Sequence, residues 1–311
     1  MKSTQKKSIL LPLLLVMALP STVRLEAKDK KEKPAIGSAP AVMWREPTDI
    51  ASRDLFYGPG GKEHAPSGKL VYQKENLNGV NPKFDVIDSN GVRWGVKLGD
   101  EARPETAAAR LVWAVGYFTA EYYYLPEIKP QQLPELSRGA ELIEYDGSIK
   151  AVRLKRHNEA EKKIGNWHWE SNPFASTRQL DGLRIMMELI CNTDLKLEHR
   201  VIYDVNGKEQ RYYITDLGGS FGKAGLGFTR TKGVLKDYRA RPLIQKDCGD
   251  FLDFWHFKHI PRQNAKWIGS YLAQLSDSQI NDAFRAAGFS REETEGYTEA
   301  VRQKINELVR L

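Results

Sequence analysis

The residues of this sequence best suited to chemistry are one lysine and two aspartates. Lys97 lies near the end of an apolar run (RWGVKL), Asp194 follows a helical run, and Asp216 ends another apolar run just before two glycines. The strong turn signal at Asn206 and Gly207 predicts a β-hairpin with the two aspartates at its open ends, so we expect their carboxylates to lie together. Phosphoryl transfer needs this set of groups: a cation on the phosphates, a carboxylate ligand for Mg²⁺ and a carboxylate near the attacking hydroxyl.

Glu105 is the expected partner of Lys97. It stands in the first turn of a predicted helix, directly after Pro104, where a carboxylate also complements the positive end of the helix dipole. Each of these residues has a plain structural alternative as well. Lys97 would then be a solvated strand end, Glu105 a helix-end charge, and the two aspartates ordinary turn residues.

Three segments around these residues resemble the protein-kinase-like superfamily. Residues 193–199 (TDLKLEH) are similar to the catalytic loop RDLKPEN, and residues 215–219 (TDLGG) are similar to the DFG segment, with a short hairpin between the two in both cases. The VKL around Lys97 is similar to the strand that carries the ATP-binding lysine. The resemblance is to atypical members, namely HipA-type, spore-coat CotH-type and secretory-pathway kinases, and most of all to exported bacterial kinase-like proteins of unassigned function.

The resemblance implies a role for each residue. Asp194 would orient or deprotonate the acceptor hydroxyl, and Lys196 would contact the transferred phosphate. Asp216 would hold Mg²⁺ or Mn²⁺, while Lys97, steadied by Glu105, would bind the α- and β-phosphates of ATP. The acceptor would be a hydroxyl on a protein, a lipid or a sugar, and nucleotidyl transfer from a reversed ATP stays open as a variant.

The sequence also departs from the kinase pattern. His199 stands where the loop has its metal-binding asparagine, and it is a candidate metal ligand although Mg²⁺ prefers oxygen. Asn192 is an alternative oxygen ligand at a different position. No glycine-rich loop precedes Lys97, because Gly79 stands alone, and no APE motif follows Asp216.

Two functions of different classes therefore remain open. The first is an exported kinase-like phosphotransferase that uses ATP and a divalent metal. The second is a catalytically inactive pseudokinase that acts as a binding or scaffold protein. Lys97, Asp194 and Asp216 together favour the enzyme, whereas His199 and the missing glycine-rich loop favour the pseudokinase.

The elements that must position these residues change character along the chain. Strand-like runs and turns dominate before residue 165, with one main helix, and helical periodicity dominates after residue 175. This order predicts an α+β, bilobal kinase-like fold, with a β-rich N-lobe at residues 44–165 and a helical C-lobe at residues 166–311 that contains the catalytic-loop hairpin. The predicted strands are residues 70–73, 84–87, 93–98, 140–145, 150–155, 200–203 and 211–215. The predicted helices are residues 105–117, a helix capped by Ser176 or Thr177 that ends near residue 192, and residues 266–275, 278–287 and 291–311.

The N-terminal residues predict export. Three lysines precede an eleven-residue apolar run (ILLPLLLVMAL), which is too short to span a bilayer as a helix and is typical of a signal peptide. We assign residues 1–27 to the signal, cleaved after Ala18 or Ala27, and residues 28–43 to a flexible linker. An uncleaved anchor is the alternative. The mature protein is expected in the periplasm or outside the cell, without a transmembrane span.

Composition excludes several classes of protein. The 311 residues are 41% hydrophobic and 28% charged, which is typical of globular proteins and rules out a disulfide-dense scaffold or a polytopic membrane protein. A net charge of +7 is mild for this length and does not indicate a nucleic-acid partner. Cys191 and Cys248 could pair or remain two buried thiols. The basic residues within 223–241 favour a solvated loop, with acceptor or phosphate binding as the alternative.

Overall fold

The computed structural model describes residues 39–223, 229–244, 246–248, 251–254 and 256–311. The predicted signal at residues 1–27 and most of the predicted linker lie outside these residues. At the end of that linker, β1 (Ala41–Val42) pairs in parallel with β9 (Glu209–Ile214), and the following Met43 is buried. The last residues of the predicted linker therefore belong to a sheet.

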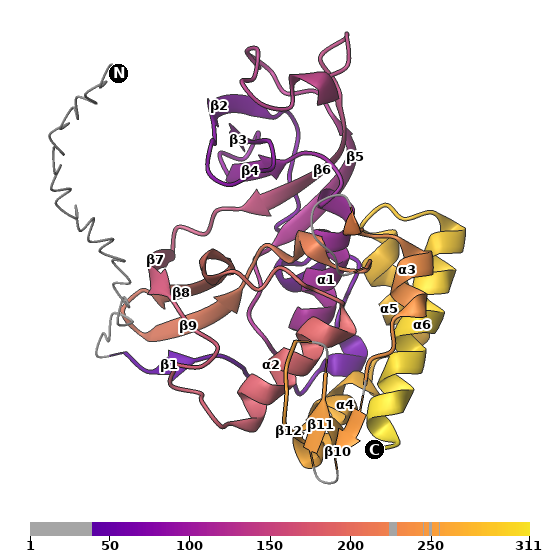
Figure 1. Ribbon diagram of the computed structural model, residues 1–311. Helices are drawn as coiled ribbons and strands as arrows, with labels where there is room; N and C mark the ends of the chain where they lie inside the picture. Colours follow the sequence, from indigo (N-terminus) through magenta and orange to yellow (C-terminus); the bar gives the residue numbers. More distant parts are fainter. Residues whose placement is uncertain (1–38, 224–228, 245, 249–250, 255) are drawn as a thin grey trace, which may run out of the picture. The chain divides into compact units, whose positions relative to one another are not determined.

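A five-stranded antiparallel sheet carries Lys97. Its strands follow the order β2 (Val71–Glu75), β3 (Lys83–Ile87), β4 (Arg93–Lys97), β6 (Ile149–Arg156) and β5 (Tyr122–Ile128) (Figure 1). The β3–β4 turn confirms the prediction from its Asn-Gly pair, because Gly91 has a φ of 78° and its N–H donates to the carbonyl of Asp88. Phe84, Val86, Trp94 and Val96 form part of the core of this sheet.

One predicted strand before β6 does not form. Residues 140–142 make a short 3-10 turn instead of the first half of a hairpin, and only Ile143 bridges to Ile149. The turn at Gly147 is present, with a φ of 82°. The strand β5, which lies far earlier in the sequence, takes the place beside β6.

Helix α1 (Ala102–Ala114) lies between this sheet and the helical part of the chain (Figure 1). It contacts β5 and β6 on one side and α5 (Asp277–Arg285) on the other. The small side chains of Ala107, Ala108 and Ala109 are fully buried, which allows close approach of neighbouring elements. The main helix of the β-rich half thus contributes to the larger of the two hydrophobic cores.

A second sheet holds the predicted catalytic hairpin. Strands β8 (Arg200–Val205) and β9 are antiparallel, with β7 (Glu161–Asn166) outside β8 and β1 outside β9. Asn206 and Gly207 have φ values of 53° and 69°, so both central residues of the turn are left-handed, and the Lys208 N–H closes the turn by donating to the carbonyl of Val205. Residue 165, where we placed the boundary between the two lobes, lies within β7. Because β7 pairs with β8, the whole strand belongs to the sheet of the hairpin.

The remaining chain is mainly helical, as predicted. Helix α2 (Arg178–Leu189) begins at Thr177, whose hydroxyl accepts a hydrogen bond from the Leu180 N–H. It is followed by α3 (Leu235–Ala240), by α4 (Arg262–Leu272), by α5 and by α6 (Arg291–Val309). A small sheet of β10 (Lys246–Cys248), β11 (Phe251–Asp253) and β12 (Ile260–Pro261) precedes α4.

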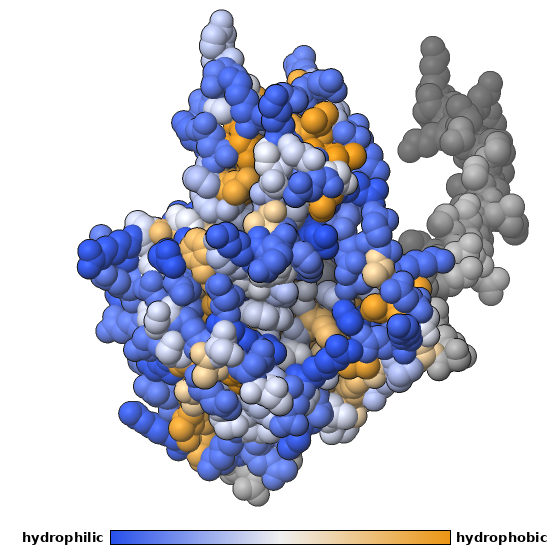
Figure 2. All heavy atoms as spheres, turned by 180° about the vertical axis from the view of Figure 1, so that it is seen from behind, coloured by the Kyte–Doolittle hydropathy of each residue, from blue (hydrophilic) through white to orange (hydrophobic). Residues whose placement is uncertain are grey.

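Cys191, two residues after the end of α2, is a free, buried thiol that donates to the carbonyl of Gly222. The side chain of Cys248 lies outside the described residues. Within the described part of the chain, no helix is both long and apolar enough to cross a membrane. The face shown in Figure 2 is mostly hydrophilic, with small apolar groups scattered among the polar ones.

Candidate active site

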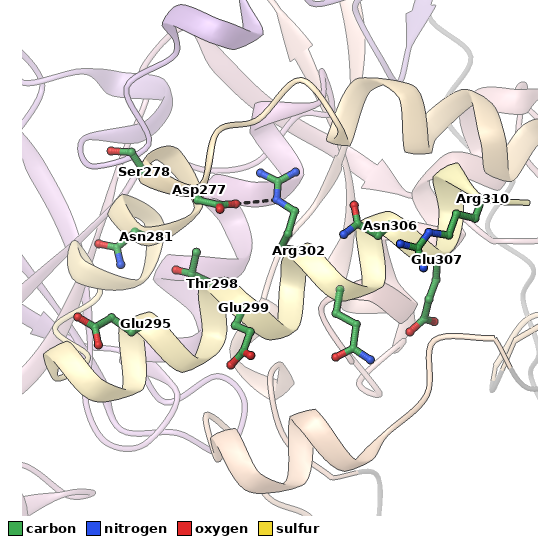
Figure 3. A pocket seen from close by; sticks show the side chains of 11 residues that line it. Asp277, Ser278, Asn281, Glu295, Thr298, Glu299, Arg302, Asn306, Glu307 and Arg310 are labelled. Atoms are coloured by element: carbon green, nitrogen blue, oxygen red, sulfur yellow. Dashed lines mark hydrogen bonds and ion pairs between the residues drawn. The ribbon is translucent and has the colours of Figure 1, made fainter.

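A cavity of about 980 Å³ separates the five-stranded sheet from the loops at the open end of the β8–β9 hairpin. Its lining includes all six residues singled out in the sequence: Lys97, Glu105, Asp194, Lys196, His199 and Asp216. The expected juxtaposition of Lys97 with the two aspartates is therefore present. A second hollow, between α5 and α6, is lined by none of these residues (Figure 3).

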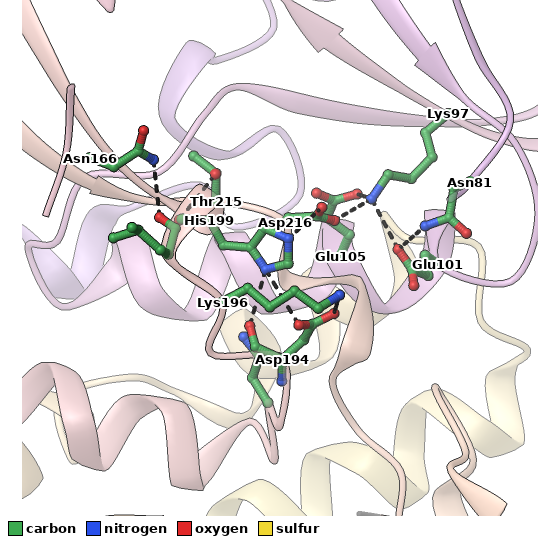
Figure 4. A network of polar contacts seen from close by, with 12 residues as sticks. Asn81, Lys97, Glu101, Glu105, Asn166, Asp194, Lys196, His199, Thr215 and Asp216 are labelled. Atoms are coloured by element: carbon green, nitrogen blue, oxygen red, sulfur yellow. Dashed lines mark hydrogen bonds and ion pairs between the residues drawn. The ribbon is translucent and has the colours of Figure 1, made fainter. Parts of the chain in front are cut away.

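Lys97 lies at the end of β4 with only 2% of its surface exposed. Its ammonium group lies 3.0 Å from Glu105, 3.0 Å from Glu101 and 2.5 Å from Asp216 (Figure 4). Burial alone would lower the pKa of Lys97, but the three carboxylates, Glu105 first, raise it above its usual value. The Lys97 side chain is therefore positively charged. It forms ion pairs with two glutamates at the start of α1 and with Asp216 after the hairpin.

Glu105 holds two cations at once. Besides Lys97, it accepts two hydrogen bonds from Arg153 on β6, at 3.0 and 2.9 Å. Both partners of Glu105 are almost fully buried, and the Arg153 guanidinium also stacks over the Tyr122 ring at 4.7 Å. The predicted Lys97–Glu105 pair is therefore present, and it is part of a buried network that the sequence pattern did not indicate.

Glu101 is the main residue at this site that the sequence analysis missed. It contacts Lys97, accepts from the Asn81 amide at 2.6 Å and also pairs with Lys232. Burial tends to raise the pKa of Glu101, but Lys97 and Lys232 lower it overall. The sequence signal that could have indicated this contact is the short spacing of four residues between Lys97 and Glu101. The signal is weak because a turn from strand to helix separates the two residues.

Asp216, two residues after the end of β9, has a left-handed backbone with φ 56° and ψ 53°. One carboxylate oxygen contacts Lys97, and the other lies 3.1 Å from Nε2 of His199. Burial would raise the pKa of Asp216, but His199 and Lys97 hold it well below its usual value. This carboxylate is therefore ionised. Its side chain is one-third exposed and lines the cavity.

His199 joins the two aspartates (Figure 4). Its Nδ1 lies 3.1 Å from the backbone carbonyl of Asp194 and 3.7 Å from the Asp194 carboxylate, while its Nε2 faces Asp216. Burial lowers the pKa of His199, but Asp216 and Asp194 together raise it above the ordinary value. Both ring nitrogens thus have protein partners, so a metal would have to displace one of them.

Asp194 lies in the loop before β8, with a side chain that is 16% exposed. It pairs with Lys196 at 3.2 Å, and its backbone N–H donates to the side-chain oxygen of Asn192. That bond uses the oxygen of Asn192, which is buried and does not line the cavity. Thr215 fixes the loop to β9, because its N–H and its hydroxyl both donate to the carbonyl of His199.

The two glycines after Asp216 permit close approach. A Cβ at Gly218 would lie 2.5 Å from the Cβ of Glu101, and a Cβ at Gly219 would collide with the Arg230 guanidinium. Arg230 lines the cavity 3.6 Å from Asp194, and its Nε and Nη2 are buried without an acceptor among the described residues. Arg230 and Lys232 of the basic stretch thus belong to the cavity, whereas Arg239 pairs with Glu299 outside it.

Mg²⁺ or Mn²⁺ would find an oxygen ligand here, but not a complete set. In the described ranges, no group of three or more His, Cys, Asp or Glu side chains is arranged to hold a metal ion. Mg²⁺ commonly binds through one or two carboxylates and completes its shell with water and substrate phosphates. The ionised Asp216 fits that pattern, with the remaining ligands supplied by a phosphate-bearing substrate.

Comparisons with known proteins show the fold. No family model matches the chain, and no curated protein matches its sequence. Among solved structures, the crystal structure of the Helicobacter pylori proinflammatory kinase CtkA is similar, with a TM-score of 0.50 and 11% sequence identity. The match covers 79% of this chain and 97% of that one. The predicted α+β kinase-like fold is therefore confirmed, while the identity is too low to carry over a residue role.

Proposed function

We propose that this protein is an exported kinase-like phosphotransferase that uses ATP and Mg²⁺ or Mn²⁺ to modify a hydroxyl acceptor. The observation that supports this most is the single cavity that contains a buried lysine and two aspartates, with the lysine paired to a helix glutamate. These residues come from β4, α1 and the two loops of one hairpin. The kinase-like fold is consistent with the same assignment.

The roles follow from charge and position. Lys97 carries a permanent positive charge at the cavity wall and would contact the phosphates of ATP. Asp216 would hold the metal, which when bound neutralises phosphate charge during transfer. Asp194 would accept the proton of the acceptor hydroxyl as its oxygen attacks the terminal phosphorus, and ADP would leave with the bridging oxygen. Lys196, paired with Asp194, would contact the transferred phosphate.

A pseudokinase remains the second candidate, and one observation favours it. The His199 Nε2 lies 3.1 Å from one carboxylate oxygen of Asp216, so an imidazole already occupies an oxygen that a metal ion would need. In addition, the loop over the cavity, residues 76–82 between β2 and β3, contains only one glycine, Gly79 with a φ of 72°, in place of a glycine-rich loop. A binding or scaffold role requires neither a free metal-binding carboxylate nor a glycine-rich loop.

Calorimetry with ATP and Mg²⁺ or Mn²⁺ on the mature chain tests the proposal. We expect Asp216→Asn to abolish metal-dependent nucleotide binding, because the metal loses its ionised oxygen ligand. Asp194→Asn should leave nucleotide binding nearly intact and slow phosphoryl transfer about 10²–10⁴-fold, which is measurable as ATP hydrolysis with water as acceptor. Asp282→Asn, a surface change on α5, is the matched control.

Wild-type protein that binds no nucleotide with either metal would overturn the enzyme proposal and leave the pseudokinase. Equal binding by wild type and Asp216→Asn would instead remove Asp216 from the metal site. The control should bind nucleotide as wild type does in both experiments.

Export is also part of the proposal. It is supported by the basic and apolar N-terminal sequence, which is typical of a signal peptide. N-terminal sequencing of protein from the periplasm or the culture medium should find a chain that starts after Ala18 or Ala27. Intact Met1 in a membrane fraction would show an anchor instead.

A further inference from the structure

Two lysines on the sheet side of the cavity make no direct ion pair among the described residues. Lys83 on β3 and Lys155 on β6 both line the cavity, and within the described residues neither ammonium group has a hydrogen bond or an ion pair. The other cavity cations differ from them in this respect. Lys97, Arg153, Lys196, Arg230 and Lys232 each face at least one carboxylate.

The strand register places both lysines on the same face as Lys97. Lys83 is directly opposite Lys97 on the neighbouring strand, and Lys97 is opposite Arg153 on the next one. Lys155 lies two residues beyond Arg153, opposite Gly95, so it points to the same side. Four cationic side chains therefore cover two adjacent rows of the sheet above the cavity.

The space around these lysines is open enough for a ligand. Both lysines line the cavity of about 980 Å³, and Gly95, which has no side chain, lies beside Lys155 in the second row, between it and Asp85. The Lys83 ammonium is 3.4 Å from the place that a Cβ on Gly79 would take, so it lies beneath the loop over the cavity. The nearest acidic residue of the second row, Asp85, faces His157 and Lys74, each at 3.8 Å.

Keeping these charges unpaired has a cost. Burial, then Arg153, lowers the pKa of Lys155 to about 8, although Glu105, Asp216 and Glu161 oppose this shift. Burial, then Lys97, also lowers the pKa of Lys83. Two unpaired, partly buried cations beside a third are unfavourable in a free protein, and an anionic ligand would relieve the repulsion.

We propose that Lys83 and Lys155 bind the phosphate oxygens of a polyphosphate, on the sheet side of the cavity beside Lys97. Lys97 is already surrounded by three carboxylates, so these two lysines supply the positive charge that is free to meet an anion. The inference rests on the proposed function in that ATP is the expected polyphosphate. The site itself recognises linked phosphates, which inorganic tripolyphosphate presents without a base.

Calorimetric titration of the mature chain with inorganic tripolyphosphate, without metal or nucleotide, tests this site. Lys83→Gln and Lys155→Gln should each lower the affinity about tenfold, as expected for one lost charged hydrogen bond. Lys155→Arg should retain most of the affinity because the charge is kept. Lys150→Gln is the matched control, because Lys150 lies on the same strand and outside the cavity.

Wild-type affinity for tripolyphosphate in both glutamine variants would overturn the inference, and thermal unfolding of each variant shows whether it is folded. Titration of the same variants with ATP and Mg²⁺ separates this result from the proposed function. Tripolyphosphate binding through the two lysines without any ATP binding supports the site and removes the kinase proposal. ATP binding that needs Asp216 but neither lysine supports the kinase proposal and removes the site.

Discussion

At the scale of single residues, the environment of His199 determines how Asp216 could meet a metal. The imidazole lies between the two aspartates, and its pKa is raised by Asp216 and Asp194 against the effect of burial. A ring that is protonated in this position donates from both nitrogens and cannot bind a metal. It also places a positive charge 3.1 Å from the carboxylate that we propose as the metal ligand.

Replacing this ring by an amide is therefore informative. We expect His199→Asn to raise the Mg²⁺ affinity up to about tenfold, because the imidazole that contacts Asp216 is removed and an amide oxygen is supplied. The same change should lower the free energy of unfolding by about 1–3 kcal/mol, because the contacts between the two loops are lost. Calorimetry and urea denaturation measure the two effects, with His64→Asn, outside the cavity, as control. Unchanged metal affinity would contradict this account of His199.

At the scale of elements, the turn after β9 brings α1 and the hairpin into contact. Asp216 adopts a left-handed conformation, and the next residues turn tightly enough for Gly218 to pack against Glu101. Gly219 instead packs against the flexible end of Arg230. The two glycines therefore have different neighbours: Gly218 lies against the Cβ of Glu101, which is fixed to the backbone, and Gly219 lies at the far end of the long Arg230 side chain.

This difference predicts unequal costs for the two alanine variants. Gly218→Ala should lower the free energy of unfolding by about 1–3 kcal/mol, because the new methyl group meets the Cβ of Glu101 and the backbone must shift. Gly219→Ala should cost less, because the Arg230 guanidinium can move aside. Urea denaturation of both variants checks the order. Equal stability of the two variants would contradict the packing described here.

At the scale of the whole molecule, Lys155 links stability to pH. Its pKa is about 8 in the folded chain against a usual 10.5, because of burial and Arg153. Between these two values the unfolded chain holds more protons than the folded one, so the contribution of Lys155 to stability rises with pH. Below about pH 8 the charged side chain is present in both states and its penalty is complete.

Lys155→Met should therefore stabilise the protein at pH 7 by roughly 1–2 kcal/mol, a value reduced because the side chain is only partly buried. This advantage should shrink as the pH rises from about 8 towards 10.5. Urea denaturation at pH 7 and pH 10 compares the variant with wild type and with the exposed Lys162→Met control. An advantage that is the same at both pH values would disprove the assignment of this titration to Lys155.

Several features of this protein were determined by its sequence alone. The Asn206-Gly207 turn predicted the hairpin and, through it, the meeting of Asp194 with Asp216 in one cavity. Thr177, one of the two expected cap residues, is the N-cap of the predicted helix, and the glutamate after Pro104 contacts Lys97. These outcomes were predictable because turn chemistry, helix capping and short loops act between residues that are close along the chain.

Other features were decided only by the tertiary structure. The partners Arg153, Asn81 and Lys232 of the α1 glutamates, and the convergence of Lys83 with Lys155, depend on which strands pair and in which register. The same holds for β5, which pairs with β6 where a local hairpin was predicted. A strand presents the same alternation of side chains to any neighbour, so the pattern along one segment does not reveal which distant segment will face it.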